Sequence, residues 1–243
     1  GKPLVRPAWF FDVKQQGEGI TDITTHLVDL VQWEVFPEQI LDYKKDVEIV
    51  SAKRWPTTLT AEQFEKVTLK KEYPDYLKAD VKDGILSSYS NGEINYRLKG
   101  IHAKISVTWD FQAPEGTGDT HFSVMRGTRS SAVIKQGKEQ NFKPVLYIEP
   151  AKGTNITAYE KDLMADLKQI NLKYPGVELK KIATGWEVII PEKYKVGHED
   201  HFAQVTQKYL QCLKDGKLPD WEVPNMIAKY YTTTKAREVA LGK

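Results

Sequence analysis

Two carboxylates and an imidazole follow one another at helical spacing near the start of the chain, as Asp22, His26 and Asp29. In an α-helix these positions lie at roughly 0°, 40° and −20° around the axis, so their side chains share one face. A carboxylate beside an imidazole can orient the ring and suit it to proton transfer. The spacing therefore suits Asp22 and His26 to act together in proton transfer. Asp29 is predicted to bond substrate hydroxyls or to fix the helix.

The segment that carries these residues opens on a glycine loop, Gly17-Glu18-Gly19, and we expect a helix over 21–36 that Pro37 ends. Three apolar side chains lie about a third of a turn from the acid–base face and are predicted to face the core: Ile23, Leu27 and Leu30. For Asp22 and His26 taken alone, an N-terminal Asp cap followed by a surface histidine is the alternative explanation.

The spacing G-x-G-x-x-D-x-x-x-H-x-x-D, followed by an apolar turn and Trp33, resembles the motif that opens the second domain of the Gfo/Idh/MocA oxidoreductases. In that family a complete Rossmann domain precedes the motif. The Asp and His of the motif are the family's usual catalytic pair, and they match Asp22 and His26 here. Family members usually carry three glycines before the Asp, whereas this chain has Glu18 between its two glycines.

The resemblance covers about three quarters of the chain, including 121–136 and 202–219, and is closest to a subgroup of putative oxidoreductases. It implies an α+β fold, in which an open, mostly antiparallel β-sheet has helices packed on one face and often oligomerises through the other. We expect one substrate-binding and oligomerisation domain over 1–243. Residues 142–192 fit the resemblance worst and are interpreted as an inserted helix–hairpin lobe.

The sequence has no nucleotide-binding motif of its own. No G-x-G-x-x-G follows a strand, and no phosphate-binding P-loop occurs. The resemblance implies that NAD or NADP is bound mainly by a domain that precedes this chain, and that the substrate is a sugar or polyol. We therefore interpret the chain as the substrate-binding, acid–base half of a nicotinamide-dependent oxidoreductase, inactive alone. Two alternatives stay open: an NAD-dependent glycosidase, and a non-catalytic carbohydrate-binding or assembly domain.

Further substrate-binding candidates lie outside the motif. Arg54 and Trp55 place a cation beside an aromatic ring where Pro56 is predicted to end a strand over 46–55. Trp can stack on a pyranose face and Arg can hold its hydroxyls, although a plain strand end is the alternative. His121 follows a glycine-containing loop, and loops on rigid scaffolds often carry function.

Composition excludes several classes of protein. A net charge of +2 with interspersed signs argues against nucleic acid, and no apolar run approaches the roughly 20 residues of a membrane helix. The lone Cys212 excludes an internal disulfide. His198 and His201 share a helix face, but no third ligand is evident, so we predict a solvated helix start and no metal.

Alternating apolar residues predict strands over 92–111 and 121–136. Strands in sequence, with helices before and after them, indicate an α+β domain. One sheet face must pack on the helices, and the other would carry either Trp109 and Phe111 or their neighbours. Since an exposed aromatic face is a liability for a monomer, we predict a homodimer or larger oligomer through the sheet.

Overall fold

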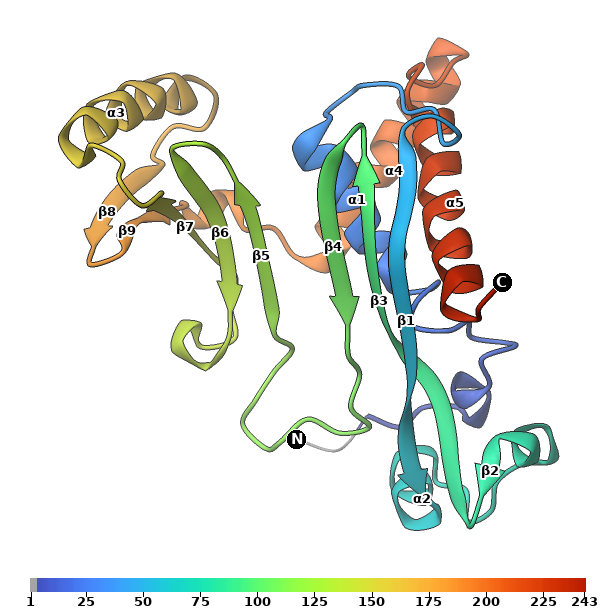
Figure 1. Cartoon of the computed structure of the whole chain (residues 1–243). Helices are drawn as coiled ribbons and strands as arrows, with labels where there is room; N and C mark the ends of the chain where they lie inside the picture. Colours follow the sequence, from blue (N-terminus) through green and yellow to red (C-terminus); the bar gives the residue numbers. More distant parts are fainter. Residues whose placement is uncertain (1–3) are drawn as a thin grey trace. The chain divides into compact units, whose positions relative to one another are not determined.

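The computed structural model describes residues 4–243, apart from the side chain of His198. The chain forms two compact units, Gly1–Gln112 with Cys212–Lys243, and Ala113–Gln211. Each combines an antiparallel sheet with helices (Figure 1), so the predicted α+β class is confirmed. The structure has two sheets where the sequence predicted one. The lobe expected at 142–192 falls inside the second unit, which begins earlier in the chain.

The first unit is a four-stranded sheet covered on one face by two helices (Figure 1). The central strand β3 (Ile85–Leu98) pairs with β1 (Val47–Thr60), β4 (Ile101–Val107) and the short β2 (Val81–Lys82). The covering helices are α1 (Thr24–Val35) and α5 (Glu222–Ala240). Alternate residues of the sheet meet both helices in one core: Val28, Ile94, Tyr96, Leu98, Ala228 and Ala236. Burial raises the pKa of Tyr96 well above its ordinary value.

β1 is longer than its sequence indicates. The prediction that Pro56 ends this strand is wrong, because pairing with β3 continues to Thr60. The register shifts between Trp55 and Thr57, and this irregularity accommodates a residue that has no N–H to donate. Arg54 and Trp55 therefore lie inside a strand. Beyond them, Thr60 caps α2 (Ala61–Thr68) through a reciprocal capping box with Gln63.

A second core lies at the far end of this sheet. It gathers around η1 (Ala8–Phe11), α2 and η2 (Asp75–Asp80). Trp109 and Phe111 follow the end of β4 and pack against this core, with the Trp109 ring 5.9 Å from the ring of Phe11. The expectation that these two aromatic residues could lie on an exposed sheet face is therefore wrong.

The open face of the first sheet is polar. Arg97 on β3 bonds to Glu48 on β1 at 3.0 Å, and Lys104 on β4 bonds to Glu93 on β3 at 2.9 Å. The hydrogen bond from Lys104 lowers the pKa of Glu93. Because charged pairs cover this face, it does not need a partner to keep apolar surface from water.

The second unit is a five-stranded sheet with one helix across it (Figure 1). The strands run in the order β5 (His121–Arg126), β6 (Ser130–Gln136), β7 (Val145–Pro150), β9 (Gly185–Ile189) and β8 (Glu178–Ile182). Helix α3 (Ile156–Lys173) precedes the β8–β9 hairpin, with η3 (Lys138–Gln140) and η4 (Glu192–Tyr194) in the connections. Both the helix and the hairpin are predicted by the sequence.

The remaining helix, α4 (His198–Asp215), links the second unit to the C-terminal segment of the first. It begins at His198, where the sequence predicts a helix start. Within residues 4–243, no helix has the length and apolar content needed to cross a membrane.

The loop before α1 rests directly on β3. The N–H of Gly19 donates to the carbonyl of Tyr89 at 3.0 Å. A Cβ on Gly19 would lie 1.9 Å from the carbonyl oxygen of Ser90, and one on Gly92 would lie 2.5 Å from Cβ of Ile20. Glycine at both positions is what lets the loop and the strand approach so closely.

Replacing Gly19 by alanine should therefore push the loop off β3. We expect the free energy of unfolding to fall by about 1–3 kcal/mol, the usual cost of overpacking a close contact. Chemical denaturation followed by tryptophan fluorescence measures this. Gly137→Ala is the control, because its added Cβ would meet only the tip of Gln140 at 3.6 Å. Equal stability of the two variants would contradict the contact.

Candidate functional site

The loop that leads into α1 turns tightly after Glu18. The N–H groups of Thr21 and Asp22 bond to the Glu18 carbonyl at 2.9 and 2.8 Å, and that of Thr25 bonds to the Asp22 carbonyl at 3.2 Å. Regular helix begins only at Thr24. The predicted helix over 21–36 thus starts later than expected, and Asp22 lies in the turn before it. The reason is that the loop's first bonds go to β3 and to this turn.

The face that α1 turns to the core lies about a third of a turn around the helix from the one the sequence predicts. Its buried residues are Thr24, Val28 and Gln32. Ile23 and Leu30 are 41% and 37% exposed, so the prediction that they face the core is wrong, while Leu27 is partly buried against it. His26 is exposed as well, and so is Trp33, at 57%. An imidazole therefore lies among apolar side chains on an open helix face: Ile23, Leu30 and Trp33.

Asp22 is half-buried and held from one side. The amide Nε2 of Gln16 donates to its carboxylate at 2.9 Å. The hydroxyl of Thr25 donates to the Asp22 carbonyl at 2.5 Å. The carboxylate is thereby fixed one helical turn before His26, with its second oxygen left for another donor. Gln16 carries no sequence signal that marks it as part of the motif.

Glu18, between the two glycines, is the centre of a buried ionic cluster. Its side chain is 4% exposed and accepts hydrogen bonds from two arginines. Arg54 on β1 donates through Nε at 2.6 Å and Nη2 at 3.2 Å, and Arg237 on α5 through Nε at 3.0 Å and Nη2 at 2.7 Å. One carboxylate thus ties the loop to a strand and to the last helix.

Arg54 is held a second time, by an aromatic ring. Its guanidinium carbon lies 3.5 Å from the centroid of the Tyr89 ring, a cation–π arrangement. Tyr89 is also the residue whose carbonyl receives the Gly19 N–H. Arg54, predicted to bind substrate hydroxyls, therefore has its guanidinium committed to Glu18 and Tyr89, a geometry that positions the loop.

Asp29 fixes the helix. Its carboxylate bonds to Lys229 of α5 at 2.8 Å, and both side chains are largely shielded, at 21% and 16% exposure. Of the two roles predicted for Asp29, this contact shows the helix-fixing one directly. The pairing attaches α1 to α5 on the side of the helix next to His26.

The other two candidates come from strands of the two sheets. Trp55 is half-buried on β1 beside the register shift. His121 begins β5 in the second unit, opposite Gln136. The structure therefore gathers Asp22, His26, Asp29 and Arg54 around one loop and helix, and a role for Trp55 or His121 in substrate binding stays a prediction.

Metal binding finds no support in the described part of the chain. Residues 4–243 contain no group of three or more His, Cys, Asp or Glu side chains that could hold an ion. Of the two histidines that open α4, only His201 has a described side chain, and it is exposed.

Comparison with known proteins is decisive for the family. Residues 1–241 match the family described as putative oxidoreductase C terminal domain. The chain belongs to this family. A crystal structure of a putative oxidoreductase from Parabacteroides merdae ATCC 43184 is 57% identical, with a TM-score of 0.96, over 98% of this chain and 55% of that one. No curated protein matches the chain.

The predicted resemblance to the C-terminal domain of putative oxidoreductases is thus confirmed. This oxidoreductase C-terminal domain spans about half of the length of the Parabacteroides protein, at 55%.

Removing the Glu18 carboxylate should loosen the whole site. Glu18→Ala leaves two guanidinium groups facing one another, one of them largely buried. We expect a loss of about 3–5 kcal/mol in the free energy of unfolding, as for other buried pairs broken on one side. Denaturant unfolding of the purified chain measures this.

Glu48→Ala is the matched control, because it removes a glutamate that pairs with Arg97 while 63% exposed. Exposed pairs contribute at most about 1 kcal/mol, so this variant should unfold close to the unmodified chain. Equal losses of unfolding free energy in both glutamate variants would show that the Glu18 cluster stabilises the fold no more than an exposed ion pair does.

Proposed function

We propose that this chain is the substrate-binding and acid–base half of a nicotinamide-dependent oxidoreductase of the Gfo/Idh/MocA type, acting on a sugar or polyol. The observation that carries the proposal is the position of His26. It is an exposed imidazole on a helix anchored by Asp29, one turn after a fixed carboxylate. The family match to an oxidoreductase C-terminal domain supports the reaction class.

The apolar surface around His26 supports a site completed by another part of the protein. Ile23, Leu30 and Trp33 are exposed on the same helix face. Covering this face with a cofactor-binding domain would exclude water from the imidazole and strengthen its interactions with substrate. We infer that the nucleotide-binding domain docks here, with the substrate between it and α1.

The glycine loop of this chain does not fit a dinucleotide. The space beside Gly19 is occupied by β3, since a Cβ on this residue would lie 1.9 Å from the carbonyl oxygen of Ser90. Its N–H is already used by Tyr89. A pyrophosphate cradle needs free N–H groups and room beside them. The loop therefore serves strand packing, and NAD or NADP, which would accept or supply hydride, belongs to a separate domain.

His26 would handle the proton of the reacting hydroxyl. In the oxidation direction, a neutral imidazole accepts that proton as the C–H hydride leaves the same carbon, and in the reverse direction imidazolium returns it. Asp22 would orient the ring or stabilise its charged form. Glu18, Arg54 and Asp29 act as positioning residues, because their contacts fix the loop and the helix.

Two other functions use the same residues differently. An NAD-dependent glycosidase would oxidise its sugar only transiently and show no net change in cofactor. A non-catalytic carbohydrate-binding domain would bind sugar with no cofactor dependence at all. Measuring net NAD(P)H formation alongside sugar products in the full-length protein separates the three.

His26→Ala in the full-length protein should lower the turnover rate by roughly 10²–10⁴, the usual worth of general acid–base catalysis. Cofactor affinity should change little, because another domain holds the nucleotide. Steady-state kinetics with NAD(P)H absorbance and a nucleotide titration measure both.

His102→Ala is the control, since His102 is an exposed histidine on the edge strand β4. It should leave turnover unchanged. Near-normal turnover of His26→Ala on the best substrate would rule out the mechanism.

We also propose that the full-length protein is a homodimer or larger oligomer through a sheet face. The open face of the first sheet carries Glu48–Arg97 and Glu93–Lys104, so an interface there would be polar and sensitive to salt. Light scattering at micromolar concentration should give a mass of at least two chains, falling as salt is raised. A monomeric mass at low salt would reject this assembly.

A further inference from the structure

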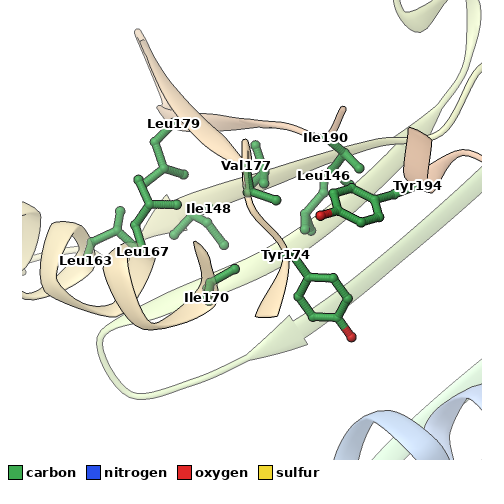
Figure 2. Close-up of a pocket in the computed structure, with 11 residues that line it drawn as sticks. Leu146, Ile148, Leu163, Leu167, Ile170, Tyr174, Val177, Leu179, Ile190 and Tyr194 are labelled. Atoms are coloured by element: carbon green, nitrogen blue, oxygen red, sulfur yellow. The ribbon is translucent and has the colours of Figure 1, made fainter. Parts of the chain in front are cut away.

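The second unit contains an apolar pocket that the proposed reaction does not use. It has a volume of about 360 Å³ and lies between α3 and the β7–β9–β8 part of the sheet (Figure 2). Cavities of this size are large enough for a small molecule. Eleven residues line it, nine of them aliphatic and two tyrosines: Leu146, Ile148, Leu163, Leu167, Ile170, Tyr174, Val177, Leu179, Val188, Ile190 and Tyr194.

The lining offers almost nothing for water to bond. The aliphatic side chains come from the helix on one side and the strands on the other (Figure 2). A pocket with such walls does not hold ordered water and instead favours hydrocarbon. Sugars or nucleotides would lose their hydrogen bonds inside it, which makes them poor ligands here.

The two tyrosines mark one end of the pocket. Their rings meet edge to face at 5.7 Å, and the hydroxyl of Tyr174 points away from the cavity (Figure 2). The Tyr194 hydroxyl donates to the Pro175 carbonyl at 3.2 Å. The far end, around Leu163, Leu167 and Leu179, is aliphatic (Figure 2). The pocket therefore has aromatic rings at one end and aliphatic side chains at the other.

Positive charge gathers at the tyrosine end. The ammonium of Lys173 lies 5.3 Å from the Tyr174 ring centroid, and that of Lys193 lies 4.9 Å from the Tyr194 ring centroid. The nearest acid in sequence, Glu192, is itself paired with Lys195 at 2.6 Å. The charge at this end suits an anion.

We propose that this pocket binds an anionic amphiphile, a medium-chain alkyl carboxylate, with its chain among the leucines and its carboxylate near Lys173 and Lys193. The apolar walls recognise the hydrocarbon, and the two lysines select the acidic head over a neutral or cationic one. This ligand site is distinct from the His26 motif in the first unit and does not depend on the proposed oxidoreductase activity.

Calorimetric titration of the purified chain with hexanoate, octanoate and decanoate tests the chain-length requirement. Each pair of methylenes should tighten binding by about fifteenfold, or about fourfold per methylene, until the pocket is full. Octanol and octyltrimethylammonium carry the same hydrocarbon with a neutral or positive head. Both should bind less tightly than octanoate.

Two variants locate the site. Leu167→Trp fills the aliphatic end and should weaken octanoate binding at least tenfold. The control is Leu172→Trp, on the same helix but 80% exposed and outside the lining, which should leave octanoate affinity unchanged. The double variant Lys173→Gln, Lys193→Gln lies at the surface, so it tests the head group even if Leu167→Trp fails to fold. It should weaken octanoate by about three- to tenfold and leave octanol as it was.

Three outcomes would overturn the proposal. These are no measurable binding of octanoate, binding that Leu167→Trp does not weaken in a folded chain, and equal affinity for the anionic and cationic octyl compounds. An oligomer that dissociates on Leu167→Trp, with no octanoate binding, would show instead that a second copy fills the pocket, and would also overturn it.

Discussion

The buried carboxylate of Glu18 is the restraint on which the arrangement around His26 depends. It joins three elements that are far apart in the chain: the glycine loop, β1 through Arg54 and α5 through Arg237. A carboxylate this deeply buried is tolerable only because two guanidinium groups compensate its lost hydration. Removing Glu18 leaves both guanidinium groups without their shared counterion, so this one residue holds the three elements together. Glycine at position 18 would leave both arginines without this acid.

The loop, once fixed, determines where the candidate acid–base residues lie. Gly19 sits against β3 because nothing larger fits beside the Ser90 carbonyl. Asp22 follows three residues later, and α1 begins at Thr24, so the direction of the helix follows from the loop. The Asp29–Lys229 pair then fastens the helix to α5. The loop contacts and the Asp29–Lys229 pair hold the helix in place and leave His26 exposed.

Local patterns predicted the structure well, and distant pairings could not be predicted. Strand alternation over 92–111 located most of β3 and all of β4. The helix–hairpin lobe expected at 142–192 likewise contains α3, β8 and β9. The capping box of Thr60 and Gln63 is a pattern of the same local kind, because both partners lie within one turn. Nothing local, however, connects Glu18 with Arg237, which are 219 positions apart. At Pro56 the predicted strand end was wrong for the opposite reason. The local rule that proline ends a strand was overridden by a register shift, which the long pairing with β3 stabilises.

The rotated face of α1 shows why an apolar stripe in the sequence need not face the core of its own unit. The helix buries Thr24 and Gln32 and exposes Ile23, Leu30 and Trp33. Within residues 4–243, both side-chain polar atoms of Gln32 lack a hydrogen-bond partner, which costs free energy that an apolar residue would not. Amphipathic reasoning assumes that the apolar stripe faces the core of the same unit, and here the apolar stripe surrounds His26 instead. A helix that buries polar residues and exposes apolar ones is suited to pack against a second surface. On the proposed function, that second surface belongs to the nucleotide-binding domain. Once covered by it, the apolar stripe would exclude water from the imidazole.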